Sequence, residues 1–159
     1  MKITVLCAGK IKEKFYRDAI AEYAKRLSRF CTFAVIEVAD ENTPQAAGTA
    51  EEEAIRCTEG KRLLAHIRPD DYVTALAIGG KRWDSEAYSH HLSDLMLHGR
   101  SSVTFVIGGS LGLSEEVLSR ADEKLSFSAF TFPHQLMRVI LAEQIYRWFK
   151  IMNHEPYHK

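Results

Sequence analysis

One segment sets the fold class of this chain: Ser102-Val103-Thr104-Phe105-Val106-Ile107-Gly108-Gly109-Ser110-Leu111-Gly112. Its first six residues form a short apolar run rich in β-branched side chains, which is typical of a buried strand. The glycines after this run predict a tight turn, and Ser114 followed by two glutamates is typical of a helix N-terminus. The segment therefore predicts a strand, a turn and a helix in succession.

The same alternation extends over the whole chain of 159 residues. Strands are expected at Lys2–Ala8, Phe33–Val38, Asp71–Ile78, Ser102–Ile107 and Leu125–Phe127. Helices are expected at Phe15–Phe30, at Thr49–His66, after Asp84 through Leu97, after Ser114, and at His134–Met152 after Pro133. This pattern predicts an α/β fold with a mostly parallel sheet and helices on both faces. No linker or repeat interrupts it, so residues 1–159 are expected to form a single domain.

The composition, 46% hydrophobic and 26% charged, is ordinary for a soluble globular protein. No apolar run approaches the roughly 20 residues that a membrane-spanning helix needs, so no membrane partner is expected. The apolar stretch Met1–Ala8 is too short for a signal peptide and is expected to be the first strand. Cys7, Cys31 and Cys57 are scattered without a paired motif, which favours a reducing, cytoplasmic location.

The charges cancel overall but not locally. There are 21 basic and 21 acidic residues, yet residues 1–30 hold eight Lys/Arg against three Asp/Glu, and residues 31–60 hold one against seven. The asymmetry indicates either two solvated faces of opposite sign or a contact between a polyanion and four N-terminal cations: Lys10, Lys12, Lys14 and Arg17. A protein without net charge should bind free nucleic acid weakly, so shape would have to supply much of any RNA recognition.

The glycine turn lies where open α/β sheets bind ligands, between a strand and a helix. Gly108 and Gly109 would allow the backbone to approach a ligand closely or to adopt positive φ. The turn is not a phosphate loop, because no Gly-Lys-Ser/Thr follows, and its glycine spacing differs from that of the dinucleotide fingerprint. A ligand cradle and a plain strand-to-helix connection both stay open.

The last seven residues, Asn153–Lys159, place an amide, two imidazoles, a carboxylate, a phenol and an ammonium after a long apolar helix. With the glycine turn, they suggest a site that the C-terminus closes. The letters His154-Glu155-Pro156-Tyr157-His158 match the zinc motif H-E-x-x-H, but Pro156 would break the helix that this motif requires, so no metal is expected. His134 is a better site candidate than the histidines expected on helix surfaces: His66, His90, His91 and His98.

The last helix is expected to pack on the sheet, because its apolar residues recur at helical spacing: Met137, Ile140, Leu141, Ile145, Trp148, Phe149 and Met152. Trp148 and Phe149 are also candidates for a subunit interface. The charged residues between them are interpreted as a polar face: Arg138, Glu143, Arg147 and Lys150. The residues alone therefore indicate an α/β ligand-binding protein whose chemistry stays open.

Four linked motifs resemble one family: Ile107–Ser114, Phe132–Arg138, Ala142–Arg147 and Pro156–Lys159. In this order, and over the whole chain, they are similar to the small bacterial methyltransferases that modify N3 of a pseudouridine in large-subunit (23S) rRNA. These enzymes belong to the SPOUT class, which uses S-adenosyl-L-methionine (SAM).

The resemblance implies an α/β fold whose C-terminal part forms a trefoil knot, although true knots are very rare in proteins. It also implies a homodimer that binds SAM in the knot, with these residues around the cofactor: Leu76, Gly108, Gly109, Phe127, Ser128, Ala129, Phe130, Thr131 and Phe132. The implied substrate is a pseudouridine in a helix-capping loop of large-subunit rRNA, methylated on assembled ribosomes. Residues 153–159 are implied to be an active-site tail, which completes the site with help from the partner subunit.

Three residues are expected to carry the chemistry: His158, Tyr157 and Arg138. An imidazole exchanges protons near neutral pH, so His158 is a candidate to accept the imide proton from N3. Tyr157 is expected to stack on or hydrogen-bond the extruded base, and Arg138 or Lys159 to hold phosphate. Two other readings stay open: a flavodoxin-like module that senses a nucleotide without catalysis, and a related enzyme that acts on transfer RNA.

Overall fold

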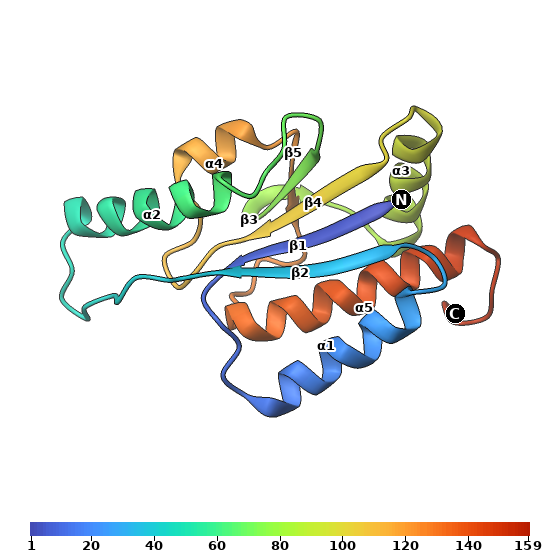
Figure 1. The fold of residues 1–159 in the computed structure, drawn as a ribbon, viewed down its shortest axis with the longest axis horizontal. Helices are drawn as coiled ribbons and strands as arrows, with labels where there is room; N and C mark the ends of the chain where they lie inside the picture. Colours follow the sequence, from blue (N-terminus) through green and yellow to red (C-terminus); the bar gives the residue numbers. More distant parts are fainter.

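The computed structural model describes all of residues 1–159, and its centre is a five-stranded sheet in which every strand pairing is parallel (Figure 1). The strands are β1 (Lys2–Ala8), β2 (Thr32–Val38), β3 (Tyr72–Arg82), β4 (Ser102–Ile107) and β5 (Glu123–Ser126), in the spatial order β2-β1-β4-β3-β5. Because all strands run the same way, their carboxyl ends lie along one edge of the sheet. The predicted α/β fold is confirmed.

Five helices cover both faces of the sheet: α1 (Lys14–Leu27), α2 (Thr49–Leu64), α3 (Ser85–Leu97), α4 (Glu115–Arg120) and α5 (His134–Met152). Helices α1, α3 and α5 pack together on one face, and α2 packs with α4 on the other (Figure 1). The predicted N-terminal caps of α3 and α4 are confirmed. The side chain of Asp84 accepts a hydrogen bond from the N–H of Ala87 (2.7 Å), and the side chain of Ser114 accepts one from the N–H of Val117 (3.3 Å).

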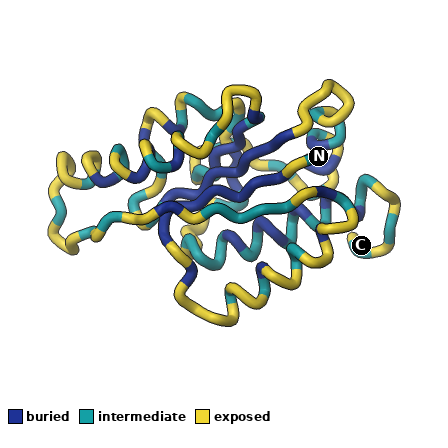
Figure 2. The backbone as a smooth tube through the Cα atoms, in the orientation of Figure 1, coloured by how far each residue is buried: buried dark blue, intermediate teal, exposed yellow.

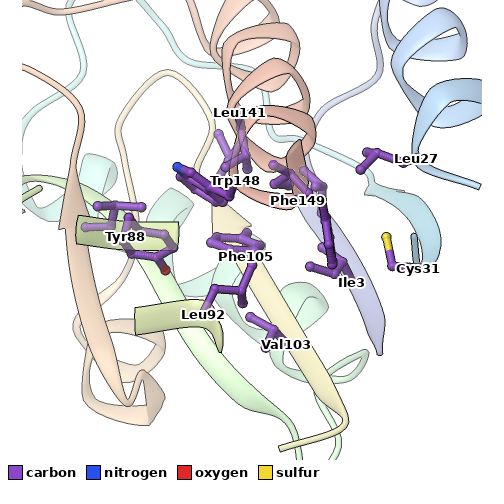
Figure 3. Close-up of a cluster of buried hydrophobic side chains, with 14 of the residues drawn as sticks. Ile3, Leu27, Cys31, Tyr88, Leu92, Val103, Phe105, Leu141, Trp148 and Phe149 are labelled. Atoms are coloured by element: carbon purple, nitrogen blue, oxygen red, sulfur yellow. The ribbon is translucent and has the colours of Figure 1, made fainter. Parts of the chain in front are cut away.

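The sheet separates two hydrophobic cores. In the larger one, the ring of Phe105 from β4 lies 5.9 Å from Trp148 of α5 and 6.3 Å from Tyr88 of α3, measured between centroids (Figure 3). The smaller core lies under α2 and α4, around Leu63 and Val106. Every residue of β4 is buried, and Figure 2 shows this central part of the sheet enclosed by more exposed helices.

The boundaries of β3 and β5 differ from the sequence-based prediction. β3 continues to Arg82 instead of ending at Ile78, and β5 begins and ends slightly earlier than expected. β5 begins earlier because Glu123 and Lys124 already pair with Thr74 and Ala75. β3 is longer because its pairing with β5 breaks between Leu76 and Lys81 and then resumes, so residues 77–80 leave the ladder. A strand analysed alone does not reveal this irregularity, because the second stretch of pairing depends on its neighbour.

The structure corrects the interpretation of α5. Trp148 and Phe149 are only 2% and 3% exposed, so they belong to the core and do not form a subunit interface. Arg138 and Lys150 are also buried instead of lying on a polar face, and each is paired with a glutamate. Helical spacing identifies the side of a helix that faces the sheet, but it does not show that neighbouring elements also cover the flanks.

One histidine expected on the surface is also partly buried. The ring of His91 stacks on Trp83 with 5.0 Å between centroids, and its Nε2 lies 3.1 Å from a carboxylate oxygen of Glu123. It therefore lies against β5, on the side of α3 that faces the sheet. The other three are exposed, as expected: His66, His90 and His98.

Two further expectations concern the chain as a whole. The strand order does not decide whether the C-terminal part forms a trefoil knot, so the knot stays a prediction. None of the five helices combines the length and the apolar character that crossing a membrane would require.

We expect Phe105→Ala to lower the free energy of unfolding by about 3–5 kcal/mol, because it removes a fully buried ring and leaves a cavity. Urea unfolding, followed by tryptophan fluorescence, measures the change. Phe15→Ala is the matched control: its side chain is 62% exposed, so the loss should stay below about 1 kcal/mol. Equal losses in the two variants would contradict the described core.

Candidate active site

A pocket opens at the edge of the sheet where the carboxyl ends of β3, β4 and β5 meet. Its empty volume is about 600 Å³, including the part open to solvent. The lining residues are Leu76, Ala77, Ile78, Ile107, Gly108, Gly109, Gly112, Leu125, Ser126, Phe127, Ser128, Phe130, Thr131, Phe132, His134 and Met137. This edge is where parallel α/β sheets bind their ligands.

The glycine turn after β4 forms one wall of the pocket. A β-carbon on Gly108 would lie 2.5 Å from the backbone carbon of Gly112, and one on Gly109 would lie 2.9 Å from a carboxylate oxygen of Glu59. In this turn only Gly112 has a positive φ (+81°). Gly108 and Gly109 do not, so positive φ is not the reason for glycine at these two positions. Gly108 is required because backbone atoms of Gly112 occupy the space that a side chain would need, whereas the space beside Gly109 is filled by the carboxyl group of Glu59.

The interruption of β3 forms a second wall. Leu76 ends the first stretch of β3 pairing, and Ala77 and Ile78 follow it around the pocket. After this interruption, the backbone at Gly80 lies close to β5 again. A β-carbon on Gly80 would lie 2.7 Å from the carbonyl group of Lys124. The same irregularity that extends β3 therefore gives the pocket its apolar side.

The segment after β5 forms the third wall. Ser126 Oγ donates a hydrogen bond to the carbonyl of Ser128 (3.1 Å), and Ser128 Oγ accepts one from the N–H of Phe130 (3.0 Å). These bonds fold the segment into a local turn. The side chain of Phe130 is 79% exposed at the rim, and Ala129 does not line the pocket.

The first turns of α5 complete the pocket with His134 and Met137. Burial, together with the positive charge of Arg138, lowers the pKa of His134, so its imidazole is neutral at neutral pH. The sequence already favours His134 among the histidines. Nothing in the sequence pattern assigned Met137 to the pocket rather than to the core, because an apolar residue at helical spacing fits both.

Arg138 is not part of the pocket lining. Its Nη1 donates to Glu37 Oε1 (2.9 Å) and its Nη2 to the carbonyl of Ala8 (2.8 Å), and its side chain is fully buried. These bonds tie the start of α5 to the ends of β1 and β2. This placement gives no support to the expected phosphate contact, since both terminal nitrogens are engaged within the protein.

The tail, residues 153–159, folds back onto the outer surface of α5. Tyr157 donates a hydrogen bond to Glu143 Oε1 (3.0 Å), and the guanidinium of Arg147 lies 4.7 Å from its ring centroid. His158 Nδ1 lies 3.4 Å from the same guanidinium. The structure thus brings Tyr157 and His158 together, but neither lines the pocket of its own chain.

The base of the tail is fixed by charge. Glu155 accepts a hydrogen bond from Lys150 Nζ (2.5 Å) and pairs with Arg29, which follows α1. His154 turns the chain in a left-handed conformation (φ +52°), so the H-E-x-x-H letters do not form a helix. No group of three or more His, Cys, Asp or Glu side chains converges as a metal site would require.

Sequence comparisons connect this geometry to known proteins. A family profile described as predicted SPOUT methyltransferase matches residues 1–158. The chain belongs to the SPOUT methyltransferase family. Similar proteins include the ribosomal RNA large subunit methyltransferases H of Bifidobacterium adolescentis (57% identical), Carboxydothermus hydrogenoformans (56%) and Clostridium novyi (55%), and each comparison covers 100% of both chains.

SPOUT methyltransferases use SAM, and the pocket suits such a ligand. Leu76 and Phe127 supply apolar surface, the glycine turn presents bare backbone, and Ser128 and Thr131 add hydroxyl groups. Of the residues expected around SAM, all except Ala129 line the pocket. Their individual contacts with SAM stay predictions.

We expect Gly108→Ala to weaken SAM binding roughly tenfold or more, because its β-carbon would meet the backbone of Gly112, which cannot move aside as a flexible side chain can. Calorimetric titration with SAM measures the affinity. Gly48→Ala is the control, since a β-carbon at Gly48 meets nothing within 4 Å. Wild-type affinity in Gly108→Ala would show that SAM does not depend on this turn.

Proposed function

We propose that this chain transfers a methyl group from SAM to N3 of a pseudouridine in large-subunit (23S) rRNA, on assembled ribosomes. The rRNA part rests on one observation: proteins that are 55–57% identical over their full length are named ribosomal RNA large subunit methyltransferase H. The choice of base and atom rests on the resemblance of the four motifs, including Pro156-Tyr157-His158-Lys159. Action on ribosomes would also give the chain a cytoplasmic location.

His158 is assigned the proton transfer. SAM supplies a methyl group bonded to a cationic sulfonium, so the chain must bring N3 into line with it, and orientation alone can supply effective molarities of ~10⁵ M or more. N3 carries an imide proton that a base has to accept. The imidazole of His158 sits at the end of the tail, where its nitrogens face Arg147 and Glu86.

Tyr157 is assigned to the base rather than to the proton. Burial, and the hydrogen bond that its hydroxyl donates to Glu143, raise the pKa of Tyr157 above the ordinary value of a phenol. The phenol therefore stays protonated at neutral pH and is suited to stacking on or donating to an extruded nucleobase. Lys159 is assigned the phosphate contact, whereas buried Arg138 would act by holding α5 in place.

We propose that the active unit is a homodimer in which each tail completes the partner's pocket. Within one chain, Tyr157 and His158 contact Glu143 and Arg147. At 1.5 Å per residue, these positions lie about 9–15 Å along α5 from Met137 of the pocket. A tail held there is displaced from the pocket of its own chain.

The rim of the pocket supports a second chain at this place. Ile78 and Phe130 are 60% and 79% exposed, although both are large apolar side chains. Large exposed apolar groups that gather at one site commonly mark an interaction surface. A partner subunit that covers the rim would remove them from water.

The basic N-terminal segment is a proposed rRNA contact. Lys10 and Lys12 are exposed, while Arg17 donates to the carbonyls of Ile11 (3.1 Å) and Lys12 (2.7 Å) and so organises the backbone that carries them. The chain as a whole has no net charge, so shape and two subunits would supply the specificity that bulk charge does not.

We expect a labelled methyl group to pass from SAM to assembled ribosomes but not to free large-subunit rRNA or bulk transfer RNA, with all three taken from cells that lack this protein. Mapping should place the label on a single pseudouridine. Label on transfer RNA would favour the related transfer-RNA enzyme. SAM binding without transfer to any of the three would contradict the proposed substrate, and absence of SAM binding would favour a binding module without catalysis.

Truncation after Asn153 should abolish methyl transfer and leave SAM affinity within about twofold of wild type, because no residue beyond Asn153 lines the pocket. Mixing this variant with Gly108→Ala, at a SAM concentration too low to fill the weakened pocket, then tests the dimer. In a mixed dimer with shared sites, the intact pocket of the truncated chain meets the intact tail of its partner, so activity should return. If activity does not return after subunit exchange, confirmed by mass spectrometry, each tail serves the pocket of its own chain.

A further inference from the structure

Glu59 of α2 is a buried carboxylate directly behind the glycine turn. Its residue is 3% exposed, and its Oε2 is enclosed without a hydrogen-bond partner. Its Oε1 accepts a hydrogen bond from the N–H of Glu41 (3.0 Å). A buried carboxylate with one unpartnered oxygen is costly, so its presence requires an explanation beyond helix formation.

The carboxyl group of Glu59 occupies the place of a missing side chain. A β-carbon on Gly109 would lie 2.9 Å from Glu59 Oε2, 3.2 Å from Oε1 and 3.4 Å from the carboxyl carbon. Gly109 therefore presents one side of its backbone to the pocket and the other to Glu59. This contact joins α2 to the turn at a residue that lines the pocket.

The next residue of α2 makes a second close contact with the same connection. A β-carbon on Gly60 would lie 2.2 Å from Ser114 Oγ, the oxygen that caps α4. The loop before α2 joins in, since Thr43 Oγ1 lies 3.1 Å from Ser110 Oγ in the turn. Residues 59 and 60 thus pack against both ends of the strand-to-helix connection, at Gly109 and at Ser114.

We propose that Glu59 is a positioning residue for the cofactor turn: its carboxyl group holds Gly109 in place and so determines how tightly SAM binds. The inference rests on the proposed use of this pocket for SAM. Glu59 does not itself line the pocket, so it acts only through the turn. Burial raises the pKa of Glu59, against the lowering effect of the Glu41 N–H. Burial therefore disfavours the charged form of the carboxyl group, and glutamine reproduces its shape without the charge.

A double-mutant cycle in the full chain tests the contact between Glu59 and Gly109. The affinity of each variant for SAM is measured by titration. Glu59→Ala and Gly109→Ala should each weaken SAM binding roughly tenfold, whereas the double variant should bind no worse than Glu59→Ala, because removal of the carboxyl group makes room for the new β-carbon. The affinity of Glu59→Gln for SAM should stay within roughly threefold of wild type. In Glu59→Ala, KM for SAM should rise while kcat at saturating SAM is unchanged. Glu53→Ala, an exposed glutamate of the same helix paired with Arg56, is the control and should leave SAM affinity unchanged.

The outcomes separate this inference from the proposed function. If wild-type protein binds SAM and the two substitutions act additively, or if Glu59→Ala keeps wild-type affinity, the role of Glu59 is overturned while the function stands. If wild-type protein does not bind SAM, the use of the pocket is overturned as well. Should Glu59→Ala fail to fold, Glu59→Asp carries the cycle, because it withdraws the carboxyl group from Gly109 by one methylene.

Discussion

The buried guanidinium of Arg138 is the interaction on which the arrangement of the site depends. Taking a charged group out of water costs several kcal/mol, and here Glu37 and the carbonyl of Ala8 offset that cost. These bonds fix the start of α5 against the ends of β1 and β2. The pocket residues of α5 lie within one turn of Arg138, and the tail follows at the opposite end of the same helix, so one anchor sets the position of both.

The architecture was largely accessible from the sequence, because it depends on local patterns. Apolar runs and helical spacing located most strands and helices, and the caps at Asp84 and Ser114 marked two helix starts. The extension of β3 was not accessible, because it depends on pairing with β5. The burial of Arg138 was also missed, since spacing alone reads any charged residue on a helix as solvent-facing.

Most residues that line the pocket could be predicted from the sequence, but the residues packed behind them could not. The glycine turn and the family motifs pointed to most of its lining, but the residue behind the turn is one glutamate among several in α2. Only the fold brings Glu59 against Gly109, fifty residues away in the chain. The tail shows the same limit: its residues stood out by their chemistry, whereas their packing on Glu143 and Arg147 required the structure.

The crowded turn after β4 divides this pocket into a part that can change and a part that cannot. Backbone atoms of Gly112 occupy the space beside Gly108, and the Glu59 carboxyl group fills the space beside Gly109, so a side chain added at either glycine would have to displace one of them. Ile78 and Phe130, by contrast, stand largely free at the rim. Engineering the pocket for bulkier analogues of its methyl donor would therefore have to change residues of the rim, because the turn is already closely packed.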